Sequence, residues 1–393
     1  MSQKISLAPW PCFTQEEADA VSNVLLSNKV NYWTGTECRE FEKEFAQFAG
    51  TEYAVALTNG TVALDVAFIA LGIGQGDEVV VTSRTFLASV SSIINAGATP
   101  VFADVDWGSQ NITAETIRKV LSPKTKAIVC VHLAGWPCEM DAIMALAQEH
   151  GLYVIEDCAQ AHGAMYKGRS VGSIGHVGAW SFCQDKIMTT GGEGGMVTTN
   201  DKSLWEKMWS YKDHGKSFDA VYNRQHPPGF RWLHESFGTN WRMLEMQAVI
   251  GRIQLKRMPE WRAARTENAR MLAQTLSRFD AVRIPVIPDY ITHAHYKFYV
   301  FVRPEKLMKG WSRDRILQEL NDAGVSAMQG SCSEVYLEKA FDGTSLRPAQ
   351  RLPIAKELGD TSIMLQVHPS LTRDQLENVC TVLDRIFSRV LGA

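Results

Sequence analysis

Hydrophobic and polar positions follow a helical period at the start of the chain. Thr14 and Glu17 form the pair of a capping box, and apolar residues follow at the spacing of one helix face as far as Leu26. A second amphipathic segment runs from residue 40 to 48 and is closed by Gly50, a residue suited to a helix end. The pattern therefore predicts two helices before the first strand.

Short apolar runs rich in Val and Ile then alternate with longer helical patterns. This rhythm is typical of βαβ units and predicts a mostly parallel sheet with helices on both faces. The predicted strands span residues 52–57, 78–83, 99–105, 126–132 and 152–157. The rhythm is lost near residue 205, after which residues 238–258 have the pattern of one long helix. HAHYKFYVFVR then predicts a strand, and RDRILQELNDAG and RDQLENVCTVLDRIF predict two helices after it.

The change of pattern divides the chain into two domains. We predict a large α/β domain over residues 1–257 and a smaller α+β domain over residues 258–393. GIGQGD at residues 72–77 loosely matches a dinucleotide-binding glycine motif. It follows a helical pattern and precedes a strand, which is the reverse of the order that such a motif needs. We interpret it as a helix end and a turn.

Composition narrows the class of protein. The 393 residues are 45% hydrophobic, and 40 Lys plus Arg against 43 Asp plus Glu give a net charge of −3. Such a chain can build a core and has no general attraction for nucleic acid or anionic lipid. No apolar run approaches the roughly 18 residues of a membrane span, and the first residues do not resemble a signal peptide. The eight cysteines are scattered without a CxxC pair, so we expect a cytoplasmic protein with reduced thiols.

An acid and an amine lie where a sheet of this kind binds ligands. In open α/β sheets the ligand crevice lies at the C-terminal ends of the strands. The strand at 152–157 ends in Asp157, and Lys186 lies between the apolar segment VGAWSF and a glycine-rich turn. Pyridoxal 5′-phosphate uses such a pair, an amine for its aldehyde and a carboxylate for its pyridinium nitrogen. The alternative for Lys186 is a solvated surface charge.

Six segments carry a resemblance to a known family. They are NYWTGTECREFEKEFAQFAG, LTNGTVAL, GDEVVVTSRTFLAS, VIEDCAQAHGA, SFCQDKIMTTGGEGGMVTTND and GTNWRMLEMQAVIGRIQLKRM. Taken in this order, they resemble the DegT/DnrJ/StrS-type family of pyridoxal-phosphate-dependent nucleotide-sugar aminotransferases. The resemblance covers nearly the whole chain and implies an aspartate-aminotransferase-like fold (fold type I). It also implies a homodimer with shared active sites.

The resemblance extends to a substrate class. The segments are most similar to enzymes that aminate C4 of a UDP-4-keto-6-deoxy-N-acetylhexosamine for pilin or surface-glycan glycosylation, with L-glutamate as the implied amino donor. IMTTG follows Lys186 where many relatives carry an Asn-Leu-type segment. A branch of the family with His in place of this lysine performs 3-dehydration, and Lys186 argues against that reaction. A dehydratase of the same fold and a non-catalytic sugar-nucleotide-binding protein are the alternatives.

The resemblance implies roles around the cofactor ring. Lys186 would form the Schiff base and act as the general base, and Asp157 would pair with the pyridine nitrogen. Gln160 would donate a hydrogen bond to the phenolic oxygen, and Phe86 would stack on the ring face. His162 would support the site without reacting. Simple core packing is the alternative for Phe86.

The resemblance also implies a phosphate site. Gly60 and Thr61 open a predicted helix, whose N-terminal N–H groups suit a phosphate, and Ser181 would add a hydroxyl. Asn240 would reach the phosphate from the partner subunit. A plain helix cap at Gly60 and Thr61 is compatible with this role.

Other polar residues give weaker signals. Cys130, His132 and Cys138 do not complete a tetrahedral ligand set, so we expect no metal. His293 and His295 are expected to be half-exposed on one strand face, although His295 could lie at the edge of a substrate site. A cluster of basic residues could meet a nucleotide diphosphate across the dimer interface or could be a solvated loop: Lys212, His214, Lys216, Arg224 and Arg231.

Overall fold

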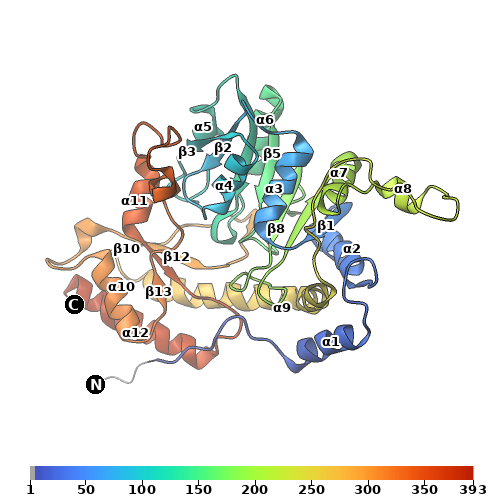
Figure 1. The fold of residues 1–393 in the computed structure, drawn as a ribbon. Coiled ribbons are helices and arrows are strands. Elements are labelled where there is room, and N and C mark those ends of the chain that lie inside the picture. The colour runs from blue at the N-terminus through green and yellow to red at the C-terminus, as the bar shows by residue number, and fades with distance from the viewer. Residues whose placement is uncertain (1–4, 393) are drawn as a thin grey trace.

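A seven-stranded sheet forms the centre of the protein (Figure 1), whose computed structural model describes residues 5–392. Every pair of neighbours from β8 to β3 is parallel, and β9 is antiparallel to both of its neighbours. The mostly parallel mixed sheet is thus confirmed. Its strand order is β1 (Tyr53–Leu57), β9 (Gly195–Thr199), β8 (Val177–Ser181), β5 (Tyr153–Asp157), β4 (Thr125–Val131), β2 (Glu78–Thr82) and β3 (Thr99–Ala103).

Both faces of this sheet are covered by helices. Val79 and Val81 of β2 belong to one apolar core, and Val80 between them belongs to another. Because successive side chains of a strand point to opposite faces, the continuous apolar runs mark strands buried on both sides. One core holds α2 (Glu37–Ala49), α3 (Gly60–Leu71), α4 (Ala88–Asn95) and α7 (Lys202–Lys212), and the other holds α5 (Ala114–Arg118) and α6 (Met140–His150).

The starts of α1 and α2 differ in how well the local sequence predicts them. The capping box of Thr14 and Glu17 begins α1 (Gln15–Leu26), as predicted. Helix α2 begins at Glu37, three residues before its predicted start at residue 40. The carboxylate of Glu245 accepts hydrogen bonds from the N–H groups of Glu37 (2.5 Å) and Cys38 (3.2 Å), so a distant residue satisfies this helix end.

The long helix α9 (Glu245–Leu276) begins later than predicted and continues further. Residues 238–244 are not helical, because the backbone of Asn240 pairs with Asp213 and that of Arg242 pairs with Leu57. The predicted helix start at residue 238 is therefore wrong. The predicted domain boundary at residue 257 falls inside α9, and the position of this division stays a prediction.

The C-terminal part is a smaller α+β unit, in agreement with the predicted class. Its antiparallel sheet has the order β10 (Val282–Arg283), β12 (Phe298–Val302), β14 (Ser362–Leu365) and β13 (Ala327–Met328). The strand predicted in HAHYKFYVFVR, residues 293–303, forms only over the five residues of β12. Helices α10 (Arg313–Asp322), α11 (Pro353–Thr361) and α12 (Arg373–Leu391) accompany this sheet, and a small separate sheet joins β11 (Ile291–Thr292), β6 (Met165–Tyr166) and β7 (Arg169–Ser170).

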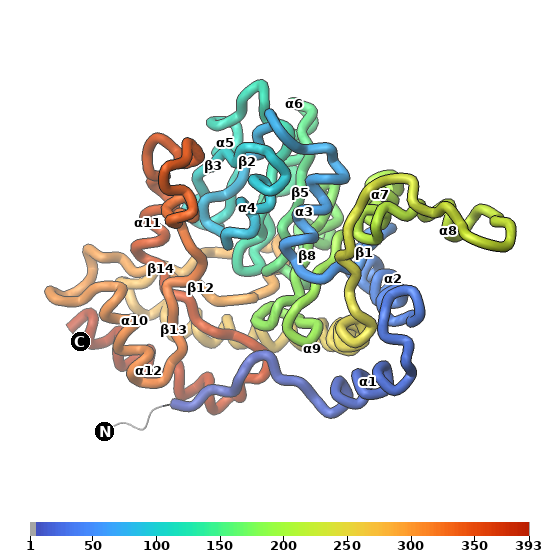
Figure 2. Tube along the Cα trace, viewed as in Figure 1, coloured from blue at the N-terminus to red at the C-terminus, as the bar shows by residue number. Residues whose placement is uncertain are grey.

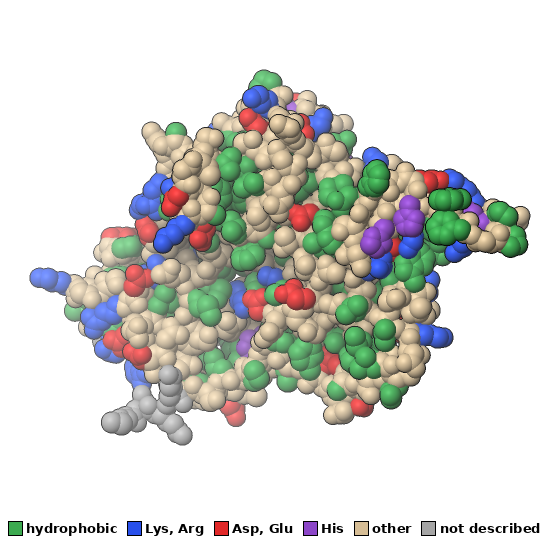
Figure 3. Space-filling view, in the orientation of Figure 1, with side chains coloured by type: hydrophobic (Ala, Val, Ile, Leu, Met, Phe, Trp, Pro, Cys, Tyr) green, Lys and Arg blue, Asp and Glu red, His purple; other side chains and the backbone are tan. Residues whose placement is uncertain are grey.

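A projecting arm, residues 213–238, extends from the body of the molecule and includes the short helix α8 (Phe218–Tyr222) (Figure 2). Several large apolar side chains of the arm are exposed (Figure 3), namely Tyr222, Phe230, Trp232 and Phe237. Phe237 is 99% exposed. Within residues 5–392, no helix is long and apolar enough to cross a bilayer.

Candidate active site

A cavity of about 1350 Å³ lies where strands of the large sheet end, against residues of the smaller unit. Asp157 and Ser181, which line it, are the last residues of β5 and β8. This is the position at which α/β sheets bind ligands. The cavity brings together these predicted site residues: Gly60, Thr61, Phe86, Asp157, Gln160, Ser181 and Lys186.

The carboxylate of Asp157 is fixed by two donors. The hydroxyl of Ser89 donates to Oδ2 at 2.7 Å, and the N–H of Ala159 donates to Oδ1 at 3.1 Å. Thr85 and Ser89 share a further hydrogen bond of 2.8 Å, which orients the serine. Two lone-pair positions of the carboxylate remain for a donor inside the cavity.

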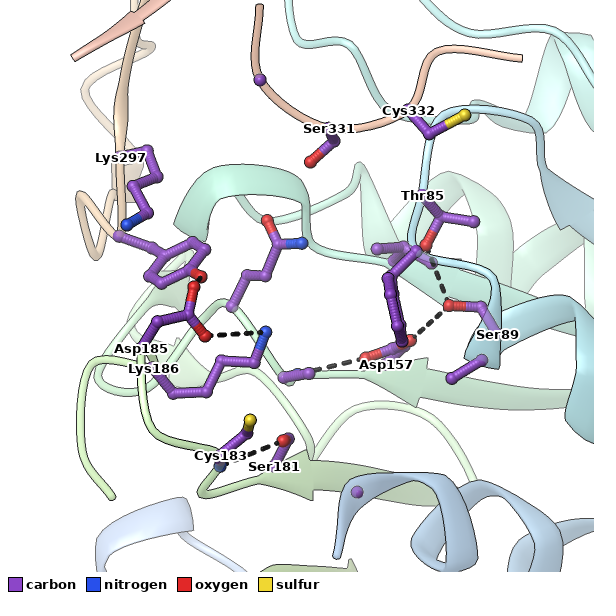
Figure 4. A pocket seen from close by; sticks show the side chains of 18 of the residues that line it. Thr85, Ser89, Asp157, Ser181, Cys183, Asp185, Lys186, Lys297, Ser331 and Cys332 are labelled. Atoms are coloured by element: carbon purple, nitrogen blue, oxygen red, sulfur yellow. Dashed lines mark hydrogen bonds and ion pairs between the residues drawn. The ribbon is translucent and has the colours of Figure 1, made fainter. Parts of the chain in front are cut away.

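Lys186 faces Asp157 across the cavity (Figure 4). Its side chain is 17% exposed, and its Nζ lies 3.9 Å from Oδ1 of Asp185. The indole N–H of Trp10 donates to the main-chain oxygen of Lys186 at 2.8 Å, so the N-terminal segment fixes the lysine-bearing turn. The amine is thus positioned on the cavity wall and is not a solvated surface charge.

Gln160 and Phe86 present suitable groups to the same space. The Oε1 of Gln160 accepts a hydrogen bond from the N–H of Ala134 at 2.8 Å, which leaves its amide NH₂ to donate into the cavity. Phe86 is 70% exposed and lines the cavity. The alternative of core packing for Phe86 is therefore wrong, and its ring face is available for stacking.

The N-terminus of α3 forms a second polar wall. The side chain of Asn59 caps this helix by accepting from the N–H of Val62 at 3.0 Å. The N–H groups of Gly60 and Thr61 have no partner inside the helix, and the first turn holds no acid. A Cβ at Gly60 would lie 2.5 Å from the Cβ of Ser181, so only glycine lets the helix end approach this hydroxyl. Such an arrangement suits a phosphate.

Asn240 does not line the cavity of its own chain. It is exposed, and it lies between the projecting arm and the start of α9. Its predicted role depends on a partner subunit and stays a prediction.

His162 lies beneath the cavity rather than in it. It is fully buried between the rings of Trp180 and Phe182, and neither ring nitrogen has a hydrogen-bond partner among the described residues. Burial, together with the charges of Lys186 and Arg265, lowers the pKa of His162 to about 3. A neutral, enclosed ring is suited to support rather than proton transfer.

A buried polar network occupies the opposite face of β5. Oε2 of Glu156 lies 2.9 Å from Nε2 of His132, and its oxygens also accept the N–H groups of Gly172, Ile174 and Gly175. Nδ1 of His132 accepts the N–H of Cys138 at 3.0 Å, which makes the ring neutral with its proton on Nε2.

Cys158 lies near this pair, and its thiol, His132 and Glu156 could in principle hold a metal ion. Both imidazole nitrogens are already engaged in hydrogen bonds, however, so the ring offers no free lone pair to an ion. We interpret the group as a structural network.

The predicted basic cluster does not form one site. Lys212 is fully buried, with its Nζ 3.5 Å from the ring centroid of Tyr32. Lys216 pairs with Asp213 at 3.0 Å, and Arg224 pairs with Asp219 and Glu235. The remaining two members, His214 and Arg231, are exposed.

The two histidines before β12 also differ from expectation. His295 is 9% exposed and has a positive φ of 47°, and the strand begins only at Phe298. Its ring stacks on that of His293 with the centroids 4.2 Å apart. The expected half-exposed strand histidine is therefore wrong for His295, because the chain turns at this residue.

Several cavity residues were missed by the sequence reasoning. Ser89 belongs to the segment that contains Phe86, and its place one helical turn after Thr85 was an available signal. Trp10, Tyr296 and Lys297 line the cavity from the N-terminal segment and the smaller unit. Nothing in the local sequence pattern links these segments to Lys186.

Comparison with known proteins identifies the family. The model of the DegT/DnrJ/EryC1/StrS aminotransferase family matches residues 11–384. The chain belongs to this family. It is 34% identical to the GDP-perosamine synthase of Escherichia coli, over 96% of this chain and 97% of that protein.

Two further relatives widen the comparison. The UDP-N-acetyl-3-dehydro-α-D-glucosamine 3-aminotransferase of Acidithiobacillus ferrooxidans is 35% identical over 89% of each chain. The crystal structure of an aminotransferase from Psychrobacter cryohalolentis is 65% identical with a TM-score of 0.97, over 98% of this chain and all of that one. This protein is thus a pyridoxal-phosphate-dependent aminotransferase of nucleotide sugars.

Proposed function

We propose that this aminotransferase moves an amino group from L-glutamate to C4 of a 4-keto-6-deoxy nucleotide sugar, a UDP-linked N-acetylhexosamine, in the biosynthesis of a surface glycan or glycoprotein. The observation that carries the proposal is the placement of Asp157 and Lys186 on facing walls of one cavity. The UDP-sugar named for the Acidithiobacillus relative supports this nucleotide, whereas the Escherichia coli relative is named for a GDP-linked sugar.

The cofactor fits the donor set of the cavity. Pyridoxal phosphate supplies an aldehyde that takes up the amino group and a ring that accepts electrons. Asp157, held by Ser89 and Ala159, would keep the ring nitrogen protonated through its remaining lone pairs. Lys186 would move the proton at the reacting carbon.

The other cavity residues bind and orient. The N–H groups of Gly60 and Thr61 and the hydroxyl of Ser181 would hold the phosphate at the N-terminus of α3. The amide NH₂ of Gln160 would donate to the phenolic oxygen, and the ring of Phe86 would cover the cofactor and exclude water.

The site is completed by a second subunit. Asn240 is exposed beside the projecting arm, whose apolar side chains have nothing to cover them in one chain. In a homodimer these residues would become buried, and Asn240 would reach the phosphate bound by the partner. We expect Asn240→Ala to weaken cofactor affinity about tenfold, the cost of one hydrogen bond to a charged group. Equilibrium titration of the apoenzyme with the cofactor measures it, and unchanged affinity in a dimer contradicts the shared site.

The decisive experiment supplies the purified enzyme with L-glutamate and a panel of 4-keto and 3-keto nucleotide sugars, with the products identified by mass and NMR. We expect a 4-amino sugar from the UDP-linked 4-keto substrate. Lys186→Ala should lower the rate at least ~1000-fold, since it removes both the amine and the base. The matched control, Lys119→Ala, removes an exposed lysine outside the cavity and should leave the rate unchanged.

Other products contradict the proposal in different ways. A 3-amino sugar would support transamination but place it at C3 and not at C4. Loss of the 3-hydroxyl would indicate the dehydratase. Absence of any reaction with the whole panel would overturn the proposed substrate class.

A further inference from the structure

A second lysine lines the cavity from the side of the smaller unit. Lys297 directly precedes β12, and in Figure 4 it lies on the same side of the cavity as Lys186, away from Asp157. Its Nζ donates to Oε1 of Gln366 at 2.9 Å and lies 4.6 Å from the ring centroid of Tyr296. The family resemblance and the sequence pattern had assigned this residue no role.

The charge of Lys297 has no acidic partner. No carboxylate of residues 5–392 lies within ion-pair distance of its Nζ, and its one hydrogen-bond acceptor is the neutral amide of Gln366. Burial and the nearby charges of Arg265 and Lys186 lower its pKa to about 8, against the attraction of Asp185. A half-buried ammonium group of this kind is stabilised by an anion in the cavity.

The cavity wall offers few cations for an anionic ligand. Among the lining residues, the charged amines and guanidinium groups are those of Lys186 and Lys297 alone, and the described wall includes no arginine. The acidic residues of the wall are Asp157, Asp185, Glu193 and Glu338. Lys186 is assigned to proton transfer at the reacting carbon. Lys297 is therefore the cationic side chain of the wall that is left to bind an anionic group of a substrate.

An amino-acid donor brings such an anion close to the reacting carbon. Its carboxylate is attached to the carbon that carries the amino group, so it must lie near the amine of Lys186 during transfer. We propose that Lys297 binds a carboxylate of the amino-acid donor, held in place by Gln366. This inference rests on the proposed function, and it assigns the donor to the side of the smaller unit.

The competing ligand for Lys297 is the diphosphate of the nucleotide sugar. The distribution of charge favours the donor, because the diphosphate lies at the far end of the sugar from the reacting carbon. The exposed cations of the projecting arm, such as Arg231, are available for a diphosphate at the partner's cavity.

The test uses the cofactor-loaded enzyme and measures donor and sugar separately. Single-turnover conversion of the cofactor by L-glutamate alone, followed by absorbance, gives the donor affinity without any sugar. Calorimetric titration with glutarate, a dicarboxylate without an amino group, measures carboxylate binding without chemistry. Steady-state kinetics then give KM for the nucleotide sugar.

Lys297→Gln keeps a polar group beside Gln366 and removes the charge. We expect it to weaken glutamate and glutarate binding at least tenfold and to leave KM for the nucleotide sugar within twofold. Lys297→Arg should restore binding to within threefold of the wild type. Lys119→Gln, at an exposed lysine directly after α5, should change nothing. Retained cofactor absorbance and melting temperature show that each variant is folded.

Two outcomes overturn the inference. Unchanged glutamate and glutarate binding in Lys297→Gln removes Lys297 from the donor site, and a raised KM for the sugar alone assigns it to the diphosphate. If the wild type converts its cofactor with glutamate but aminates no sugar, the proposed function fails while the role of Lys297 is still decided by the donor half-reaction.

Discussion

Two neighbouring carboxylates at the end of β5 face opposite sides of the large sheet. Asp157 opens into the cavity and accepts hydrogen bonds from the hydroxyl of Ser89 and the N–H of Ala159 (Figure 4). Glu156 is fully buried on the other face, where the ring of His132 and three backbone N–H groups surround it.

The difference lies in how many donors each carboxylate has. A carboxylate has about four lone-pair positions. Those of Glu156 are all filled by protein donors, so this residue can only hold the fold together. Two of those of Asp157 are left for a ligand, so this residue can act on one. Burial alone does not distinguish them, since Asp157 is only 6% exposed.

The largest effect should come from Asp157→Asn. An amide cannot stabilise a protonated ring nitrogen as a carboxylate does, so we expect turnover to fall about 1000-fold, or about 4 kcal/mol of activation free energy. The free energy of unfolding should change by less than about 1 kcal/mol. Steady-state kinetics and denaturant unfolding measure the two quantities. Asp141→Asn, at an exposed aspartate, is the control. Near-normal turnover of Asp157→Asn would contradict a catalytic role for Asp157 that Glu156 lacks.

Glu156→Gln should have the opposite profile. The new NH₂ group faces backbone N–H groups or the ring of His132, which leaves buried donors without acceptors. We expect the free energy of unfolding to fall by about 3 kcal/mol, and turnover per folded molecule to change less than about fivefold. Chemical denaturation checks this, with the exposed Glu149→Gln as control. A loss of activity at unchanged stability would place Glu156 in the catalytic machinery instead.

Ser89→Ala tests the support of Asp157. The hydroxyl fixes one carboxylate oxygen from α4, and its loss leaves Ala159 as the one protein donor. We expect turnover to fall about tenfold, or about 1.4 kcal/mol. Ser91→Ala on the same helix is the matched control. Equal turnover in the two variants would show that the position of Asp157 does not depend on this hydrogen bond.

The smallest effect concerns acid stability. Burial alone would raise the pKa of Glu156, but hydrogen bonds from His132, Gly175 and Gly172 outweigh it and lower the pKa. A carboxyl group with a lowered pKa stabilises the fold above its unfolded pKa of about 4.3, and this contribution is lost as pH falls through the folded value.

The free energy of unfolding of the wild type should therefore exceed that of Glu156→Gln by a smaller amount at acid pH. We expect this difference to shrink by about 1 kcal/mol or more between about pH 5 and pH 3. Urea unfolding across this range measures the difference. A difference that stays constant with pH would mean that the pKa of Glu156 is the same in the folded and unfolded states.

Part of the fold followed from local sequence. The apolar runs predicted five of the seven strands of the large sheet, β1 to β5, within two residues at each end, for example β5 at Tyr153–Asp157 against residues 152–157. Strand β9 (Gly195–Thr199) was not predicted. The capping box predicted the start of α1. Both signals act between residues close in the chain, where the sequence pattern alone is sufficient.

Other features depended on distant residues. Helix α2 begins at Glu37 because Glu245 caps it, and residues 238–244 are extended because they pair with Leu57 and Asp213. Phe86, which could have been a core residue, is exposed in the cavity. No local pattern carries this information, because each outcome depends on a contact between separate segments.

The sequence by itself determined the class of fold and the family, and it predicted the pair of Asp157 and Lys186, because periodicity and ordered motifs are properties of the chain. Tertiary structure decided that protein donors surround Glu156 while Asp157 keeps lone pairs for a ligand, and it brought Lys297 to the side of Lys186 (Figure 4). The physical reason is that free lone pairs and unpaired charges are defined by neighbours in space, which only the folded chain brings together.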